Sequence, residues 1–293
     1  MNCPYCRGES GFRFSAMDRN QQTSTKSFGY RICRSCALTF IERIPDNLGD
    51  YYVNEQYDLP TSSAGFGLRA EAQRWKVELL DSVAHPGTLL EVGPATGEFA
   101  YLARARGYKP TLLEMDENCC KFLREKLQLE VVQTENPAAS LETAAHFDVI
   151  SIWQAIEHIP EYWILMERAV NSLAQGGVMI LSTPNPMSLQ ARLLGRFWPH
   201  LDAPRHLYLI PSAWMRAFAR QHGLTVVLDT TRDAGSVGLN YYGWYLAVRN
   251  AVRGRLSDRW TSFAARRITS LFRRWEEGEE GMGCSYTIAL RKT

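Results

Sequence analysis

The chain of 293 residues lacks three features that would assign it to a special class of protein. No apolar run reaches the roughly 18–20 residues that a membrane-spanning helix needs. The formal net charge is only +2, so nothing in the overall composition attracts the chain to nucleic acid or to membranes. The first residues lack the basic and then apolar profile of a secretory signal. We therefore expect a cytoplasmic protein.

An even set of cysteines is also missing, because the chain has seven. An odd number in a chain without a secretory signal argues against a disulfide scaffold. The hydrophobic fraction of 45% and the charged fraction of 22% are typical of a folded globular protein. The length allows one large domain with a small additional unit.

Four of the cysteines form two Cys-x-x-Cys pairs, and 26 residues separate the pairs. This spacing is typical of a tetrahedral zinc site whose ligands are Cys3, Cys6, Cys33 and Cys36. Four thiolates leave no position for water or substrate, so the metal is expected to be structural. It would stabilise residues 1–44, a unit too small to bury much core by itself.

The rest of the chain alternates between strand-like and helix-like segments, which indicates an α/β fold. A linker and a cap helix are predicted within residues 45–84, with helical spacing from Arg69 to Val83. Strands are predicted at 88–92, 110–115, 129–133, 147–153, 178–182, 224–230 and 284–292. Helices are predicted at 97–107, 117–127, 162–174 and 211–222, and two more within an insertion at 235–280. We expect residues 85–293 to form a doubly wound, seven-stranded, Rossmann-like sheet.

A glycine-containing loop joins the first of these strands to its helix. The segment Glu91-Val92-Gly93-Pro94-Ala95-Thr96-Gly97 has the spacing E-x-G-x-x-x-G. Glycines permit a tight turn and close approach of a ligand, and the helix that follows offers free N–H groups to an anionic group. NAD would normally require G-x-G-x-x-G, which is absent, so S-adenosylmethionine (SAM) is the favoured cofactor.

Polar residues at the ends of later strands complete the predicted cofactor site. Glu114 lies about twenty residues beyond the loop, where a carboxylate can accept hydrogen bonds from the ribose hydroxyls. The fourth strand ends in a polar cluster, and ligands of open α/β sheets bind at that edge. The predicted cofactor-binding residues are Glu91, Gly93, Pro94, Ala95, Gly97, Glu114, Met115, Glu135, Trp153 and Gln154. Trp153 and Gln154 are well placed to contact the adenosine, and a place in the core is the alternative for Trp153.

Five segments together resemble the class I SAM-dependent methyltransferases: LLEVGPATGEFA, LLEMD, FDVISIWQAIEHIP, GGVMILSTPNP and PRHLYLIPSAWMRAFARQHGL. The similarity is greatest to the branch with ubiquinone-type O-methyltransferases and zinc-ribbon-fused enzymes of sugar and cell-envelope pathways. It implies that Gly93, Gly97 and Glu114 contact SAM and that residues 1–44 are a zinc ribbon. The family often has an acid directly after the third strand, whereas this chain has Gln133 there and Glu135 two residues later.

Two histidines are candidates for the chemistry. Methyl transfer is an in-line displacement, and a base is needed when the acceptor is a hydroxyl or an acidic carbon. His158 follows the fourth strand, and His206 lies in the irregular stretch after the fifth, so both are expected at the catalytic edge. A structural role, with each ring bonded to backbone carbonyls, is an equal alternative. The tyrosines Tyr51, Tyr52 and Tyr57 either close over the cofactor or pack the ribbon against the core.

The predicted insertion is rich in arginine and aromatic residues. Its arginines are Arg249, Arg253, Arg255, Arg259, Arg266, Arg267, Arg273 and Arg274. Basic amphipathic helices with tryptophan can lie on an anionic membrane or bind an anionic substrate. A solvated lid over the active site is the simpler interpretation. Our hypothesis is that residues 240–275 form a lid over the active site and also contact a lipid-linked or phosphorylated substrate.

Three functions are compatible with these features. The leading one is methyl transfer from SAM to oxygen or carbon of a small molecule: a saccharide, a polyketide-like compound or a cell-envelope intermediate. The second is an RNA methyltransferase, but residues 1–44 have no pattern of basic and aromatic residues for stacking bases, so a nucleic-acid partner is not expected. The third is a SAM-binding protein without turnover. The sequence leaves the acceptor and the oligomeric state open.

Overall fold

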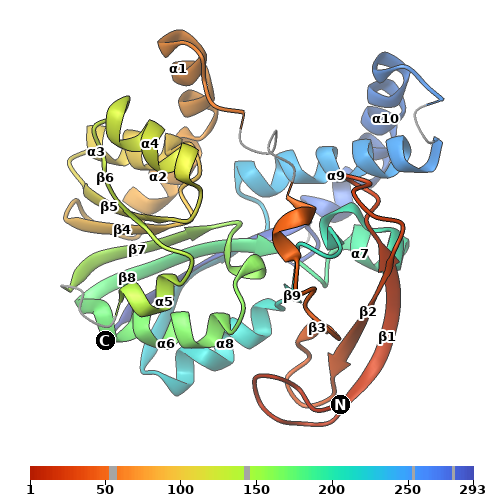
Figure 1. The fold of residues 1–293 in the computed structure, drawn as a ribbon, viewed down its shortest axis with the longest axis horizontal. Coiled ribbons are helices and arrows are strands. Elements are labelled where there is room, and N and C mark those ends of the chain that lie inside the picture. Colours follow the sequence, from red (N-terminus) through yellow and green to blue (C-terminus); the bar gives the residue numbers. More distant parts are fainter. Residues whose placement is uncertain (53–57, 142–145, 253–254, 279–280) are drawn as a thin grey trace.

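The computed structural model describes residues 1–52, 58–141, 146–252, 255–278 and 281–293 (Figure 1). Two sheets organise these residues: a central sheet of seven strands and a smaller sheet of four strands. The small sheet lies beside the carboxyl edge of the large one, and the arginine-rich helices lie above it in Figure 1.

The central sheet confirms the predicted doubly wound fold. Its order is β10 (Leu224–Thr230), β11 (Ser285–Lys292), β8 (Leu173–Pro184), β7 (Phe147–Trp153), β4 (Thr88–Val92), β5 (Lys109–Glu114) and β6 (Glu130–Gln133). The five strands from β8 to β6 are parallel, and β11 is antiparallel to both of its neighbours. The strand order reverses between β4 and β7, so the loops after these strands open at the topological switch point.

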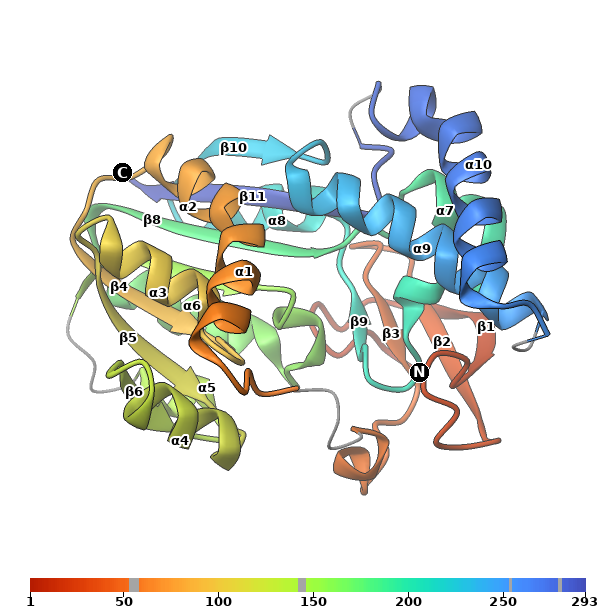
Figure 2. The ribbon, with the colours of Figure 1, turned by 90° about the horizontal axis from the view of Figure 1, so that it is seen from above.

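Helices cover both faces of the central sheet, as a parallel sheet requires (Figures 1 and 2). One face carries α1 (Ser63–Ala72), α2 (Arg74–Asp81), α3 (Glu98–Ala105) and α4 (Glu117–Glu125). The other carries α5 (Pro137–Ser140), α6 (Tyr162–Ser172) and α8 (Ser212–Gln221). The single helix expected from Arg69 to Val83 is in fact two, because Gln73 leaves the helical conformation between α1 and α2.

The small sheet consists of β1 (Ser10–Met17), β2 (Ser27–Cys33), β3 (Thr39–Ile41) and β9 (Tyr208–Leu209). Strand β9 comes from the irregular stretch after β8 and pairs with β3, so a distant segment completes the sheet of the N-terminal unit. One hydrophobic cluster runs from the small sheet to β7, β8 and α6. Residues 1–44 and the central sheet therefore share a core across the predicted boundary between them.

The two remaining long helices form the insertion. They are α9 (Ala234–Val252) and α10 (Asp258–Glu276), and α10 projects from the body of the molecule in Figure 1. The irregular stretch after β8 contains α7 (Leu189–Leu194) and the short helices η4 (Gly195–Phe197) and η5 (Pro199–Leu201). Short helices also occur at η1 (Leu48–Tyr51) and η3 (Ile156–His158). Within the described ranges, no helix has the length and apolar character needed to cross a membrane.

A buried ion cluster joins the small sheet to the segment after η5. The guanidinium of Arg205 is 1% exposed, and it donates to Asp18 at 2.8 and 3.2 Å, to Asp202 at 2.8 and 2.9 Å and to the carbonyl oxygen of Tyr51 at 3.0 Å. Asp18 directly follows β1, whereas Asp202 and Arg205 precede β9. The cluster therefore fixes the small sheet against the chain that carries His206.

Loss of the Arg205 guanidinium should destabilise the folded protein. We expect Arg205→Ala to lower the free energy of unfolding by about 3–5 kcal/mol, because Asp18 and Asp202 would remain buried without their partner. Urea denaturation measures the change. The matched control is Arg216→Ala, which breaks the more exposed pair with Asp229 and should cost about 0–1 kcal/mol. Equal effects of the two variants would contradict this assignment.

Candidate functional site

The loop between β4 and α3 forms a tight turn. Gly93, Ala95 and Gly97 have positive φ angles of 70°, 50° and 78°. A Cβ atom at Gly97 would lie 2.3 Å from Cδ2 of Leu123, and one at Gly93 would lie 2.9 Å from Cβ of Ala155. Both positions therefore require glycine, for their backbone angle and for space.

Glu114 lies beside this loop, as the sequence predicts. Its Oε2 atom accepts a hydrogen bond from the backbone N–H of Ala95 at 3.0 Å, and Oε1 accepts from Met115 at 2.8 Å and from Asp116 at 2.9 Å. Burial raises the pKa of Glu114, while these N–H donors oppose the shift. The carboxylate at the end of β5 thus stands next to the turn after β4.

Glu91 is the first acid of the loop motif and is 3% exposed. Its Oε2 atom is buried and has no hydrogen-bond partner among the described residues. Burial raises the pKa of Glu91 to about 8, and the charge of nearby Lys76 opposes the shift. A buried carboxylate oxygen without a donor is costly, so this atom is suited to a cationic ligand group.

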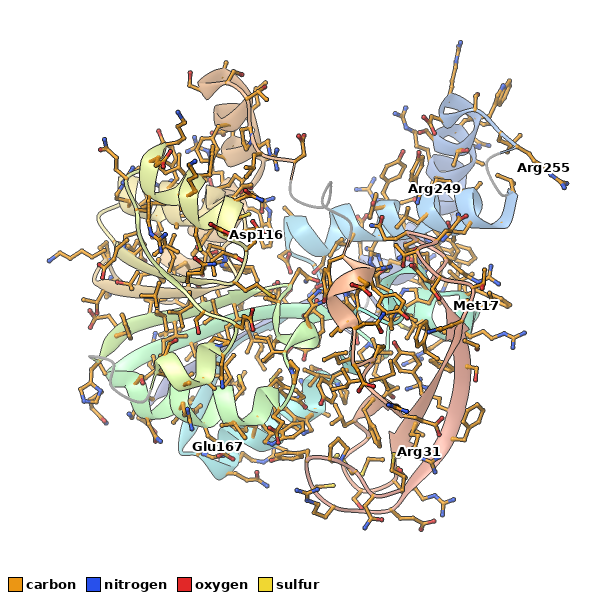
Figure 3. The ribbon with its side chains drawn as sticks, in the orientation of Figure 1. Met17, Arg31, Asp116, Glu167, Arg249 and Arg255 are labelled. Atoms are coloured by element: carbon orange, nitrogen blue, oxygen red, sulfur yellow. The ribbon has the colours of Figure 1, made fainter. Side chains whose placement is uncertain are left out.

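Residues that follow β5 and β6 form the outer side of the same edge. Met115 is a large apolar side chain that is 64% exposed directly after Glu114. The backbone N–H of Thr134 donates to the carbonyl oxygen of Glu114 at 2.8 Å, which brings the exposed Glu135 to this edge. Asp116, labelled in Figure 3, caps helix α4 by accepting from the N–H of Cys119 at 2.7 Å.

The two predicted residues at the end of β7 point elsewhere. Trp153 is buried and packs edge-on against Phe99 and Trp75 in the core between the sheet and its helices. The side-chain amide of Gln154 donates to the hydroxyls of Ser182 and Ser285, at 3.2 and 2.7 Å. These contacts fit the structural alternative for Trp153, and cofactor contacts by either residue stay predictions.

The two candidate histidines lie side by side, with ring centroids 4.6 Å apart. Nδ1 of His158 lies 3.1 Å from the carbonyl oxygen of Arg205 and 2.9 Å from the hydroxyl of Tyr52. Nδ1 of His206 lies 2.8 Å from the carbonyl oxygen of His200. Burial lowers the pKa of His158 to about 3, so its ring is neutral at pH 7.

Glu157 is a third member of this cluster, and the sequence analysis did not select it. Its side chain is 1% exposed, Oε2 accepts from the hydroxyl of Thr183 at 3.0 Å, and Oε1 lies 3.9 Å from Nε2 of His206. Burial raises the pKa of Glu157. The Glu157-His158 dipeptide directly after a buried strand was the available signal. Tyr57 and Arg253 from the sequence analysis lie outside the described residues.

The four N-terminal cysteines converge. All four Sγ atoms lie within 4.8 Å of one another, with 3.8 Å between Cys3 and Cys36 and 3.5 Å between Cys6 and Cys33. Each pair forms the same turn, because the residue after it has a positive φ angle and donates its N–H to the carbonyl oxygen of the first cysteine. These residues are Arg7 and Ala37.

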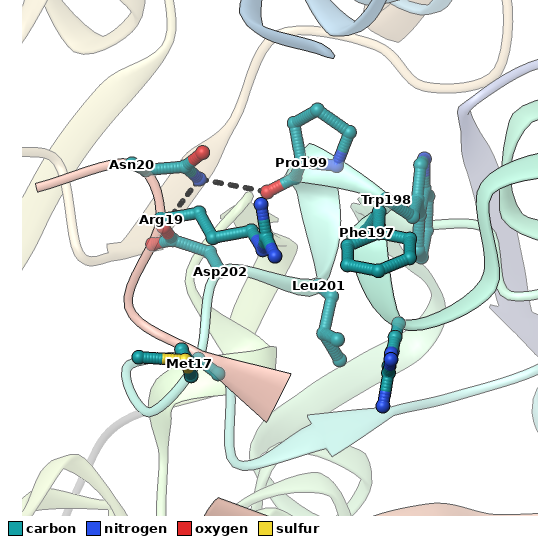
Figure 4. Close-up of a pocket in the computed structure, with 10 residues that line it drawn as sticks. Met17, Arg19, Asn20, Phe197, Trp198, Pro199, Leu201 and Asp202 are labelled. Atoms are coloured by element: carbon teal, nitrogen blue, oxygen red, sulfur yellow. Dashed lines mark hydrogen bonds between the residues drawn. The ribbon is translucent and has the colours of Figure 1, made fainter. Parts of the chain in front are cut away.

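A small hollow lies elsewhere, where the end of β1 meets η4 and η5 (Figure 4). Asn20 spans it, and its Nδ2 donates to the carbonyl oxygen of Pro199 at 2.8 Å and to Asp202 at 2.6 Å. The space measures about 10 Å³, roughly what a single water molecule requires. The hollow therefore belongs to the contact between the small sheet and the rest of the chain, and it is too small for a cofactor.

Comparison with known proteins gives the family. A family model described as "Methyltransferase domain" matches residues 67–228, which is more than half of the chain. The matched range contains the loop after β4, Glu114 and the cluster after β7. The fold is that of the class I SAM-dependent methyltransferases. The chain belongs to the methyltransferase domain family.

Individual relatives are more distant. "Ribosomal protein L11 methyltransferase" from Bacteroides fragilis is 31% identical over 117 residues, which are 38% of this chain and 40% of that protein. A solved SAM-dependent methyltransferase from Archaeoglobus fulgidus is 16% identical with a TM-score of 0.52 and is matched over 81% of this chain and 97% of its own. A mycolic acid cyclopropane synthase complexed with SAH and CTAB has 17% identity and a TM-score of 0.53, over 76% and 85% of the two chains. At these identities the two structures support the fold alone.

The raised pKa of Glu91 predicts a dependence of stability on pH. The folded protein retains this proton up to about pH 8, whereas the unfolded chain loses it near 4.5, so ionisation destabilises the fold as the pH rises through this range. We expect the melting temperature of Glu91→Gln, relative to that of the wild type, to increase as the pH is raised from about 5 to 8. Glu130→Gln, at an exposed position of β6, is the control. A difference between Glu91→Gln and wild type that does not change with pH would refute the assignment.

Proposed function

We propose that this protein transfers a methyl group from SAM to a small-molecule acceptor at the carboxyl edge of the central sheet. The observation that carries the proposal is the position of Glu114, whose carboxylate lies 3.0 Å from the N–H of Ala95 inside the glycine loop. A glycine turn and a carboxylate beside it are the two parts that the amino-acid and ribose groups of SAM require.

The residues present fit the separate groups of this cofactor. The N-terminal end of α3 offers N–H groups to the methionine carboxylate, and the unpartnered oxygen of Glu91 suits its ammonium. Oε2 of Glu114 accepts one N–H and has a second lone pair for a ribose hydroxyl. Exposed Met115 offers an apolar surface for the adenine, and Glu135 an acceptor for its amine. Pro94 lies in the turn between Glu91 and the N-terminal end of α3, to which the ammonium and the carboxylate are assigned.

The acceptor is placed at the cluster of Glu157, His158 and His206. A Cβ atom at Gly93 would touch Ala155, so the segment that leads into this cluster adjoins the glycine loop. SAM supplies an activated methyl group, and the protein holds the acceptor in line with it. We assign to His158 and His206 the activation of an oxygen or carbon acceptor. A saccharide, polyketide-like or cell-envelope intermediate is the proposed class.

Transfer of labelled methyl tests this function. Incubation with methyl-labelled SAM and fractionated lysate should place the label in the small-molecule or lipid-linked fraction. Gly93→Arg should abolish SAM binding, because an arginine has neither the room nor the backbone angle at this position. Glu114→Gln should weaken SAM binding by about tenfold, since a charged acceptor is lost. Arg34→Gln, at an exposed position of the N-terminal unit, is the control.

Other outcomes of the same experiment would overturn the proposal. Label confined to protein would favour an acceptor like that in the name of the Bacteroides relatives, and label confined to RNA would favour a nucleic-acid substrate. Binding of SAM without transfer to any fraction would favour a protein without turnover. Undiminished SAM binding by Gly93→Arg would remove the cofactor site itself.

We further propose a structural zinc ion at Cys3, Cys6, Cys33 and Cys36. The convergence of the four Sγ atoms and the two identical turns support it, because paired thiolates on such turns suit a tetrahedral ion. The backbone N–H groups of Ser35 and Cys36 donate to the Sγ of Cys33, at 3.4 and 3.5 Å. The ion would hold the β1–β2–β3 sheet in place.

A thiol-reactive mercurial should release about one zinc ion per chain from the wild type. Cys33→Ser should release none and should melt at a lower temperature, because the small sheet shares its core with the central sheet. Cys119→Ser, which removes a buried thiol from α4, is the matched control and should still release zinc. A zinc-free wild type with unchanged stability would contradict the proposal.

Helix α10 supports a second contact, with an anionic membrane or a lipid-linked substrate. Its face toward α9 is packed, with Phe272 stacked on Trp244 at 5.2 Å. Its outer face, which we term the α10 surface, exposes Trp260, Phe263, Leu271 and Trp275 beside Arg259, Arg266, Arg267, Arg273 and Arg274. Exposed aromatic side chains with flanking arginines are typical of helices that lie in a membrane interface. Arg249 and Arg255 lie at the corner between the two helices (Figure 3).

Vesicle flotation tests this contact. We expect the protein to bind phosphatidylglycerol vesicles at low salt, to bind less at high salt and to ignore phosphatidylcholine vesicles. Phe263→Ser should weaken the binding several-fold. Phe12→Ser is the matched control, because Phe12 on β1 is 59% exposed and Phe263 is 57% exposed. Failure to bind anionic vesicles at low salt would contradict the membrane contact and favour a solvated lid.

A further inference from the structure

We infer that Glu157, His158 and His206 form a binding site for a divalent transition-metal ion, distinct from the four-cysteine site. The inference rests on the proposed function for the role of this ion, but its binding is argued from the structure alone. One ligand atom from each of the three residues lies within 4.8 Å of the others. Two imidazoles and a carboxylate are the donor set of open Zn²⁺, Fe²⁺ and Mn²⁺ sites.

The hydrogen bonds of the two rings fix the nitrogen that is available. Nδ1 of His206 faces the carbonyl oxygen of His200, and Nδ1 of His158 faces that of Arg205. A carbonyl oxygen only accepts, so we assign the hydrogen to Nδ1 in both rings, and at His158 the hydroxyl oxygen of Tyr52 accepts from the same N–H. In the neutral rings the lone pair is then on Nε2. An imidazole held by a backbone carbonyl through its second nitrogen is the usual arrangement of a metal-binding histidine.

The carboxylate of Glu157 supplies the third possible ligand atom of the group. Oε2 of Glu157 is occupied by the hydroxyl of Thr183, whereas Oε1 faces Nε2 of His206 at 3.9 Å. This separation is too long for a hydrogen bond between them. It is within the span of about 4.2 Å that two atoms can have when each binds the same ion at about 2.0–2.2 Å, and a closer approach of about 0.5 Å would give tetrahedral geometry. A cation between them would also compensate the burial of Glu157.

The three residues are held in place from two directions. Glu157 and His158 lie on η3 at the end of β7, and the N–H of Leu207 donates to the carbonyl oxygen of Glu157 at 2.9 Å. This bond ties η3 to the segment that carries His206. The same segment is fixed by the ion cluster of Arg205 and by the hydroxyl of Tyr30, which donates to the carbonyl oxygen of His206 at 2.9 Å. The ligand set is thus preorganised.

The position of this site at the carboxyl edge of the central sheet indicates a role for the ion and a class of acceptor. Three protein ligands leave positions open for other molecules, as in catalytic sites. We infer an acceptor with two neighbouring oxygens, such as a vicinal diol, a catechol or a hydroxy-carbonyl compound. An ion that binds the hydroxyl lowers its pKa, and the proton passes to solvent. The resulting oxygen anion attacks the methyl carbon of SAM: a C–O bond forms, the C–S bond breaks, and the sulfur keeps the electron pair.

Cobalt binding to the zinc-loaded protein tests the site, because the four-cysteine site is then occupied. Equilibrium dialysis and visible absorption of Co²⁺ should show about one bound ion per chain, with the weak d–d bands of nitrogen and oxygen ligands rather than sulfur. Glu157→Gln and His206→Ala should weaken Co²⁺ binding by about 100-fold or more. His200→Ala is the matched control, because His200 is buried nearby but bonds the carbonyl oxygen of Leu239 through its ring.

Folding and cofactor binding are followed in the same variants by thermal melting and SAM titration. Loss of Co²⁺ binding with intact SAM binding in Glu157→Gln would support the metal site. No Co²⁺ uptake by a wild type that binds and uses SAM would overturn the metal site and leave the proposed function standing. Co²⁺ uptake by a chain that does not bind SAM would support the metal site and overturn the proposed function. Uptake unaffected by both Glu157→Gln and His206→Ala would also overturn the metal site.

Discussion

The contact of Arg205 with Asp18 and Asp202 is the interaction on which the functional edge depends. A guanidinium that is almost fully buried is tolerated because two carboxylates and the carbonyl oxygen of Tyr51 occupy its donors. The cluster joins the N-terminal strands to the segment before β9. Through the carbonyl oxygen of Arg205 it also orients the ring of His158. The N-terminal unit is therefore part of the scaffold of the site.

This arrangement explains why a small N-terminal unit accompanies the central sheet. The β1–β2–β3 sheet gains its fourth strand from Tyr208–Leu209, only two residues beyond His206. Backbone pairing between β3 and β9 holds this segment close to η3, where Glu157 and His158 lie. A zinc ion in the N-terminal unit would thus contribute to the precision of the acceptor site although it is not part of it.

Much of the architecture follows from local sequence. Continuous apolar strands such as β7, turns at glycine and the alternation of strands and helices predict a doubly wound sheet, and the structure confirms it. The backbone angles and close contacts of the loop after β4 require glycine at Gly93 and Gly97. The spacing of these glycines in the sequence therefore predicted the turn. The approach of Glu114 to this loop was predictable because parallel neighbouring strands end at the same edge. The break between α1 and α2 was missed because the apolar spacing continues across Gln73.

What the sequence by itself determined is the set of local motifs: the four cysteines, the glycine loop, the acid at the end of β5 and the two helices of the arginine-rich insertion. Each is encoded within a few residues, by turn geometry, strand pattern or helical period. Tertiary structure alone decided which distant residues meet. The pairing of β3 with β9, the approach of Asp18 to Arg205 and the convergence of Glu157 with His206 span long stretches of chain. Such contacts depend on how packed layers position their loops, and no local propensity specifies them.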